Sequence, residues 1–199
     1  TRLGSKLYTH LHRLGFGTRT GIEFPGERDG FVNPPERWSR PSLIVMSFGY
    51  ELMVSLVQLA RAFSVIVNGG YLVNPMLMLT DAGQKERPAH TEKLYSQHTL
   101  DQMKDILEGV CSKIKIPGFR VLGKTGTARC VKEGRYSNKA HNYTFVGMIE
   151  REGYRRVVAA FIKEPEKAGL WASGVTLPLF QKIAERMVVH DKMHHGLIA

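Results

Sequence analysis

The stretch 117–131 constrains the fold of this chain more than any other part of the sequence. It reads Pro-Gly-Phe-Arg-Val-Leu-Gly-Lys-Thr-Gly-Thr-Ala-Arg-Cys-Val, a run of strand-forming residues with a cation, two hydroxyls and a glycine at its centre. Two more strand-like runs follow at 143–150 and 155–163, and the segment 151–154 between them is typical of a hairpin turn. Three successive strands of this kind predict an antiparallel sheet.

Helical patterns lie on both sides of these strands. Leucines at 3, 7, 11 and 14 fall at helical spacing, and apolar residues between 179 and 188 do the same near the C-terminus. Ser55 and Thr99 each begin a four-residue pattern ending in glutamine that is typical of a capping box, followed by an apolar stripe. Because strands and helices are segregated, with no βαβ alternation, we predict an α+β fold: an antiparallel sheet of three consecutive C-terminal strands packed with helices.

Composition narrows the class of protein only loosely. The 199 residues suffice for one well-buried domain or two small ones, and the net charge of +10 favours either an anionic partner or a solvated basic face. No apolar run approaches the roughly 20 residues of a membrane span, and residues 1–4 lack the layout of a signal peptide. The first residue is not methionine, so we expect a piece of a longer protein.

The cysteine and histidine content predicts no cofactor and no metal. Cys111 and Cys130 are too few for a disulfide framework, although they either pair or remain as buried thiols. The eight histidines are scattered without the spacing of a metal site, and the adjacent pair at 194–195 reads as part of the tail.

The central stretch matches two motifs that imply different chemistry. Read from Gly118 it spells G-x-x-x-x-G-K-T, the phosphate-loop pattern, and read from Lys124 it spells K-T-G-T. A phosphate loop must follow a strand and open a helix, so that free backbone N–H groups meet the phosphates. Here β-forming residues lie both before and after the motif, which disfavours the nucleotide-binding interpretation.

A K-T-G sequence on a strand has its own physical logic. Side chains alternate along a strand, so Lys124 and Gly126 face one way while Thr125 and Thr127 face the other. On an edge strand the backbone can pair with an extended peptide, and Gly126 lets that ligand approach closely. Lys124 supplies a positive field and the threonine hydroxyls can bind a carboxylate, although an ordinary strand with an exposed lysine fits these residues too.

The surrounding sequence resembles class B penicillin-binding proteins, and within them the division-type transpeptidases. The resemblance covers roughly residues 4–189 in the family's order, and its most specific segments are 15–27, 47–70, 117–128 and 134–162. It implies that residues 1–189 are the C-terminal portion of a penicillin-binding transpeptidase domain with a serine β-lactamase-like fold, and that residues 190–199 form a flexible tail.

That resemblance also implies an activity and a cellular setting. The intact enzyme is expected to be a peptidoglycan D,D-transpeptidase that cross-links stem peptides ending in D-Ala-D-Ala through an acyl-serine intermediate and is acylated by β-lactams. It is expected at the periplasmic face of the bacterial inner membrane, held by an N-terminal anchor, with membrane proteins of the division machinery as partners. Neither nucleic acid nor a metal is expected.

The site residues follow from the third motif of that family. By position, Lys124 and Thr127 are predicted to be catalytic, Lys124 by polarising the hydroxyl of an S-x-N motif and Thr127 by giving its N–H to the oxyanion hole. Lys124, Thr125, Gly126 and Thr127 are predicted to bind the substrate, chiefly its carboxylate.

The chain also departs from the family pattern. It contains no S-x-N, and its S-x-x-K at Ser112–Lys115 lies just ahead of the third motif, where we interpret it as a coincidence. The nucleophile is therefore predicted to lie before Thr1, and the chain alone is predicted to be inactive. Glu51 and Leu56 stand where the family usually has glycine and proline.

A different class of function remains as an alternative. The charge of +10, with Lys132, Arg135 and Lys139 clustered between the first two strands, is compatible with a basic module that binds nucleic acid or anionic lipid. Against it, the sequence shows no interleaved aromatic residues of the kind on which single-stranded nucleic acid stacks.

Overall fold

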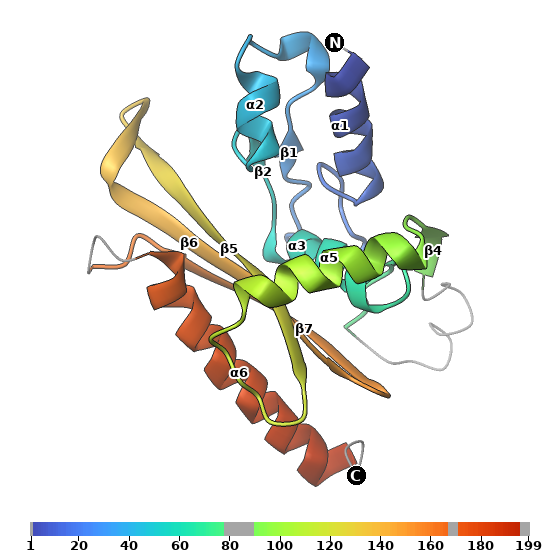
Figure 1. Ribbon diagram of the computed structural model, residues 1–199. Coiled ribbons are helices and arrows are strands. Elements are labelled where there is room, and N and C mark those ends of the chain that lie inside the picture. The colour runs from blue at the N-terminus through green and yellow to red at the C-terminus, as the bar shows by residue number, and fades with distance from the viewer. Residues whose placement is uncertain (1, 78–89, 167–170, 196–199) are drawn as a thin grey trace. The chain divides into compact units, whose positions relative to one another are not determined.

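The computed structural model describes residues 2–77, 90–166 and 171–195, which form two compact units, Thr1–Gln97 and His98–Ala199. Each unit combines helices with antiparallel strand pairs (Figure 1). The predicted α+β class is therefore confirmed. Among the described residues, no helix has both the length and the apolar character needed to cross a bilayer.

The first unit carries short strand pairs between helices. Its elements are α1 (Arg2–Arg13), β1 (Phe31–Val32), η1 (Pro35–Arg37), α2 (Ser42–Ser47), β2 (Leu52–Met53), α3 (Leu56–Val67), β3 (Tyr71–Val73) and β4 (His90–Lys93). β1 pairs with β2, and β3 pairs with β4. Leu7, Leu11 and Leu14 of the predicted stripe pack against a buried core, whereas Leu3 is exposed. Phe16, Val32, Met46 and Ala62 contribute to that core.

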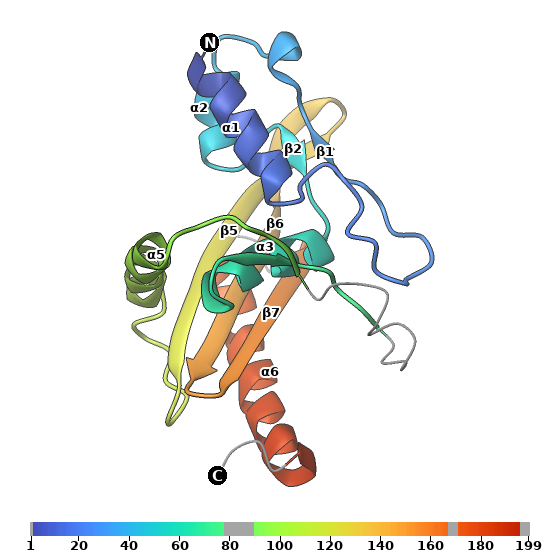
Figure 2. The same cartoon turned by 90° about the vertical axis from the view of Figure 1, so that its right-hand side faces the viewer.

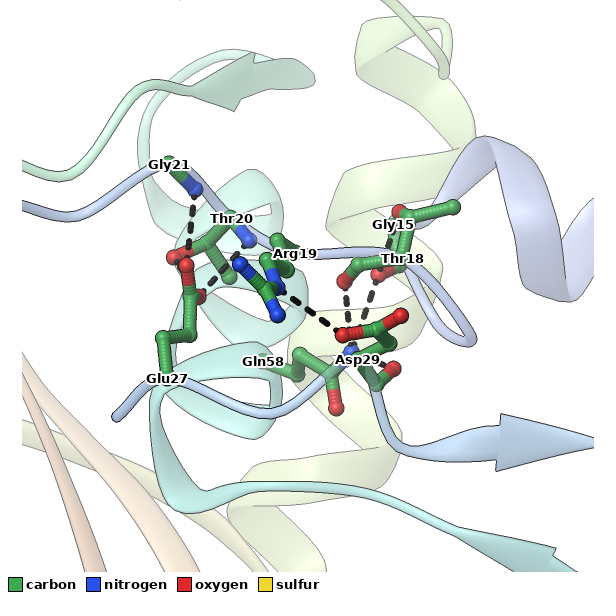
Figure 3. Close-up of polar contacts among 8 residues, drawn as sticks. All are labelled: Gly15, Thr18, Arg19, Thr20, Gly21, Glu27, Asp29 and Gln58. Carbon is green, nitrogen blue, oxygen red and sulfur yellow. Dashed lines mark hydrogen bonds and ion pairs between the residues drawn. The ribbon is translucent and has the colours of Figure 1, made fainter. Parts of the chain in front are cut away.

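The capping box predicted at Ser55 begins α3. The Ser55 hydroxyl accepts a hydrogen bond from the Gln58 N–H at 3.1 Å, and the Ser55 N–H donates to Gln58 Oε1 at 2.8 Å. Gln58 is fully buried, and its amide group does more than cap the helix. Its Nε2 donates to the carbonyls of Thr18 and Asp29, each at 2.7 Å (Figure 3). The side chain of one helical residue thus fixes the glycine- and proline-rich connection.

The carboxylate of Glu27 also stabilises this connection. Glu27 Oε1 accepts hydrogen bonds from the N–H of Thr20 at 2.7 Å and from its hydroxyl at 2.6 Å, and Glu27 Oε2 accepts from the Gly21 N–H at 3.2 Å (Figure 3). The segment is therefore ordered by polar contacts to its own backbone.

The second unit is built on a three-stranded sheet. Its elements are α5 (Gln97–Val110), β5 (Arg120–Lys132), β6 (Arg135–Arg151), β7 (Tyr154–Lys163) and α6 (Ala172–His195). The strands lie in the order β5-β6-β7, as the sequence predicts, and α6 runs along one face of the sheet (Figures 1 and 2). The helix predicted to open at Thr99 instead starts at Gln97, so Thr99 lies inside its first turn.

Two glycines make room for the aromatic rings between the sheet and α6. The rings of Phe145 on β6 and Phe180 on α6 lie 4.8 Å apart, centre to centre, in the buried core. A Cβ atom on Gly147 would lie 2.3 Å from Phe180 Cε2, and one on Gly123 would lie 2.6 Å from Phe145 Cζ. Both glycines are thus required by core packing.

The C-terminal helix continues beyond the point where a tail is predicted. α6 runs to His195, so the prediction of a flexible tail from His190 is wrong for the described part; residues 196–199 lie outside it. The cause is Asp191, which is buried and accepts hydrogen bonds from Tyr154 Oη at 2.8 Å and Arg156 Nε at 3.0 Å. Burial and the hydrogen bond to Asp191 raise the pKa of Tyr154 to about 12.

Candidate active site

A tight turn places the start of β5. Pro117 and Gly118 occupy the middle of a turn closed by a 3.0 Å hydrogen bond from the Phe119 N–H to the Ile116 carbonyl. Gly118 has φ +80°, which glycine adopts without strain after a proline in such a turn. The residue that would begin a phosphate loop is therefore a turn residue that leads into a strand.

The K-T-G segment lies in a regular stretch of β5. The pairing with β6 runs without irregularity from Arg120 to Arg129, with Lys124 opposite Val146 and Thr127 opposite Tyr143. β5 continues as a strand to Lys132. A phosphate loop requires a helix to begin at the threonine of the motif, so the nucleotide-binding interpretation is not supported.

Register decides which way each side chain faces. Thr125 is opposite Phe145, whose ring packs on α6, so Thr125 and Thr127 lie on the α6 side of the sheet. Lys124 and Gly126 lie on the opposite side, as the alternation predicts. Lys124 is exposed, and its Nζ donates to the Thr125 carbonyl at 2.9 Å.

Gly126 differs from the two glycines of the core. A Cβ added to it would make only ordinary contacts, 3.6 Å to Thr144 Cβ and 3.9 Å to the Thr144 carbonyl, and its φ is not positive. Neither packing nor backbone conformation therefore requires glycine here. A glycine that the fold does not need, on an exposed strand, is typical of a place where a ligand approaches the backbone.

β5 is an edge strand. Among the described strands it pairs with β6 alone, so the backbone groups on its other side take no part in a ladder. Such an edge can accept an extended peptide as an additional strand. Lys124, Gly126 and the two threonines thus lie on a segment that can pair with a ligand's backbone while offering a cation and two hydroxyls.

The serine and cysteines near this strand provide no second reactive centre. Ser112 lies in the turn after α5, where its N–H donates to the Gly109 carbonyl, and within the described second unit no hydrogen bond joins its hydroxyl to Lys115. Cys111 and Cys130 are free, buried thiols, which excludes the disulfide alternative. Burial raises the pKa of Cys111 to about 11 and also raises that of Cys130. In the described ranges no group of histidine, cysteine or acidic residues is placed to hold a metal.

Comparison with known proteins connects this geometry to a family. Residues 3–185 match the family described as penicillin binding protein transpeptidase domain. This chain belongs to that family. It is 31% identical to the probable peptidoglycan D,D-transpeptidase PbpC of Pseudomonas aeruginosa, over 98% of this chain and 38% of the relative. It is 34% identical to the probable peptidoglycan D,D-transpeptidase PenA of Neisseria gonorrhoeae, over 92% of this chain and 32% of the relative.

Solved penicillin-binding proteins share its fold. The apo transpeptidase domain of Burkholderia pseudomallei penicillin-binding protein 3 superposes with a TM-score of 0.81 at 30% identity, over 94% of this chain and 57% of that structure. Penicillin-binding protein 3 of Mycobacterium tuberculosis, solved with ampicillin, also gives 0.81, at 25% identity, over 94% of this chain and 46% of that structure. The chain thus spans about a third of the length of the curated relatives and about half of the structures.

Sequence reasoning missed the polar groups buried in the first unit of this transpeptidase-family chain. Arg61 on α3 is buried, and its Nε donates to the Val73 carbonyl at 2.6 Å. A Cβ on Gly15 would lie 2.7 Å from Arg61 Nη1, so that glycine makes room for the guanidinium. A charged residue within an apolar helical stripe is the signal that could have revealed this contact.

The departure from the family pattern at Glu51 has a structural counterpart. Glu51 has φ +58°, a left-handed conformation that glycine adopts freely and other residues rarely do. Its Oε2 is also buried and has no hydrogen-bond partner. The backbone at this position thus has a conformation suited to glycine, although the residue is glutamate.

Proposed function

We propose that this chain forms one wall of the active site of a peptidoglycan D,D-transpeptidase. The observation that carries the proposal is Gly126: a glycine that the fold does not require, flanked by Lys124, Thr125 and Thr127 on an exposed edge strand. Membership of the transpeptidase family supports the same reaction class.

The proposed roles follow from the chemistry of acyl transfer. A serine outside this chain attacks the carbonyl of the penultimate D-Ala, the terminal D-Ala leaves, and an amine of a second stem peptide then takes the acyl group from the serine. Lys124 provides positive charge for proton transfer and for the substrate carboxylate, which Thr125 and Thr127 also bind. The Thr127 N–H stabilises the oxyanion formed in each step. Gly126 lets the substrate backbone lie against the strand. A serine ester mechanism needs no cofactor.

The names of the relatives support the proposed ligands and location. Curated relatives are called peptidoglycan D,D-transpeptidases, and the M. tuberculosis structures are described as complexes with aztreonam and ampicillin. We therefore propose D-Ala-D-Ala stem peptides and β-lactams as ligands. Division-machinery membrane proteins are the proposed partners, and the periplasmic face of the inner membrane is the proposed site of action for the intact, N-terminally anchored protein. No observation favours the alternative of a nucleic-acid or lipid module.

A fluorescent penicillin tests the proposal in two steps. The 199-residue chain alone should form no covalent adduct, and stoichiometric labelling of Ser112 would contradict the assignment of the nucleophile. In the intact protein, Lys124→Ala and Thr127→Ala should each lower the rate of acylation by roughly 100-fold, the usual cost of losing one charge-stabilising group. Lys113→Ala, which removes a nearby exposed lysine, is the matched control and should leave the rate unchanged. Equal rates in all three variants would refute the role of the third motif.

A further inference from the structure

The part of the β5–β6 hairpin that extends beyond β7 is a second surface with its own chemistry. β7 pairs with β6 only as far as Asn142, opposite Lys163, and beyond that point the strands β5 and β6 pair only with each other. We call residues 128–141 the β5–β6 arm. Figure 1 shows it projecting from the rest of the sheet.

A tight turn closes the arm at its tip. Glu133 and Gly134 form a two-residue connection with φ +51° and +75°. Positive φ at both central residues is typical of the type I′ turn, whose twist matches that of the flanking strands. The turn therefore sets the register in which Val131 and Lys132 lie opposite Tyr136 and Arg135.

One face of the arm presents an apolar pair. Val131 and Tyr136 are directly opposite each other in the ladder, so their side chains lie together. They are 60% and 54% exposed. An apolar pair that remains exposed on a projecting ribbon has the composition of an interface anchor, because tyrosine is enriched among residues that dominate binding.

The arm also carries cations, which do not all share a face with this pair. Lys132 and Arg135 are directly opposite each other on the other face, an arrangement that disfavours the isolated hairpin. Lys132 is neutralised by Glu164 at 2.6 Å, whereas the charged groups of Arg135 and Lys139 form no ion pair within the part of the chain that the structure describes. Two cations of the arm thus remain available to a partner, and Arg135 lies on the face opposite the apolar pair.

Part of the β6 edge of the arm is closed to an added strand. The Ser137 hydroxyl accepts hydrogen bonds from the N–H groups of Lys139 and Ala140, at 3.1 and 3.0 Å. Two of the donors that a further strand would use are therefore occupied, and the pairing is irregular next to Cys130. Edge-to-edge pairing with a second copy along β6 of the arm is therefore disfavoured, and a partner on this side engages side chains.

We propose that the β5–β6 arm docks a second protein that presents acidic side chains around an apolar surface. Val131 and Tyr136 form the apolar anchor on one face, while Arg135 on the other face and Lys139 pair with acidic groups of a partner that contacts both faces of the arm. Charge complementarity with this chain of net charge +10 supports an acidic partner. With Tyr136 and His141 as its two rings, the arm lacks the succession of stacking surfaces that single-stranded nucleic acid uses.

Two synthetic probes test this proposal on the 199-residue chain, independently of the transpeptidase assignment. The probes are poly-L-glutamate and a random copolymer of glutamate and tyrosine of equal length, with binding measured by calorimetry at moderate salt. The copolymer should bind more tightly. Arg135→Ala with Lys139→Ala should weaken both probes by about tenfold, the change expected for losing roughly 1.4 kcal/mol of charge pairing. Tyr136→Ser should weaken the copolymer alone.

A control variant separates docking from general attraction between charges. Lys182→Ala with Arg186→Ala removes the same charge from exposed positions of α6 and should leave both affinities within about twofold. Equal losses of affinity in the two double variants would overturn the proposal. It would also be overturned if neither probe bound the chain. Arm-dependent binding that is tighter for polyphosphate or for phosphatidylglycerol vesicles would assign a phosphate ligand and overturn it too. Unchanged circular dichroism melting curves verify that the exposed substitutions leave the fold intact.

Discussion

Replacing Glu51 with glycine should stabilise this protein, although most substitutions at half-buried positions destabilise a fold. Glu51 has φ +58° and a buried carboxylate oxygen without a partner. A left-handed conformation costs a non-glycine residue about 1–2 kcal/mol. A buried acceptor left without a hydrogen bond costs about 1–3 kcal/mol. The greater freedom of glycine in the unfolded chain offsets about 0.4–1 kcal/mol of this gain.

The net expectation is that Glu51→Gly raises the free energy of unfolding by about 2 kcal/mol. For a chain of this length that corresponds to a rise in melting temperature of about 4–8 °C. Urea denaturation followed by circular dichroism measures the free energy directly, and calorimetry measures the melting temperature.

Two further variants separate the contributions of backbone and carboxylate. Glu51→Ala removes the carboxylate but keeps a side chain in the left-handed region, so its gain should be smaller than that of glycine. Glu133→Gly relieves a φ of +51° at an exposed turn and should gain about 1 kcal/mol or less, because no buried oxygen is involved. The reasoning is refuted if Glu51→Gly is no more stable than the parent chain, or if Glu51→Ala matches it.

Three further predictions concern other parts of the molecule. Gly126→Val should leave the melting temperature within about 2 °C while abolishing penicillin acylation of the intact protein. Gly147→Ala should instead destabilise the chain by about 2 kcal/mol or more, because the added methyl group clashes with Phe180. Similar melting temperatures for both variants would contradict the distinction between the two glycines. The hydrogen bond from Tyr154, together with Arg156, holds the pKa of Asp191 below its usual value. The contribution of Asp191 to the free energy of unfolding is therefore present above about pH 4 and is lost as pH falls through the lowered folded-state pKa. The loss of stability in acid should be smaller in Asp191→Asn, and an unchanged profile would argue against the coupling. Gln58→Ala should cost about 3 kcal/mol, because it removes a buried side chain and leaves the part-buried carbonyls of Thr18 and Asp29 without their donor. Rapid amide exchange should then appear in residues 18–29, and exchange that stays slow would show that Glu27 alone orders the segment.

Local sequence signals were sufficient for the sheet. The three strands consist of β-forming residues joined by short connections, and each pairs with its neighbour in the chain, so the pairing partners are near in sequence. The K-T-G motif could likewise be located on a strand, since the residues on both sides of it favour that conformation. The alternation of Lys124 and Thr125 then followed from strand geometry alone.

Features that depend on distant residues could not be predicted. The end of α6 depends on Asp191 contacting Tyr154 and Arg156, which lie 37 and 35 residues earlier. The difference between Gly126 and Gly147 is invisible in the sequence, because it depends on where the ring of Phe180 lies. The site residues were therefore identifiable by motif, whereas the evidence that Gly126 is free to serve a ligand required three-dimensional packing.

The contacts of Gln58 imply an order of events during folding. Its Nε2 joins α3 to carbonyls that lie 40 and 29 residues earlier, so these bonds close long loops, each at an entropic cost. The capping box at Ser55 is local and can form with the helix itself. We therefore expect α3 to form first and residues 18–29 to become ordered only afterwards. A substitution that destabilises α3 would therefore slow the ordering of a segment that begins some forty residues upstream of the helix.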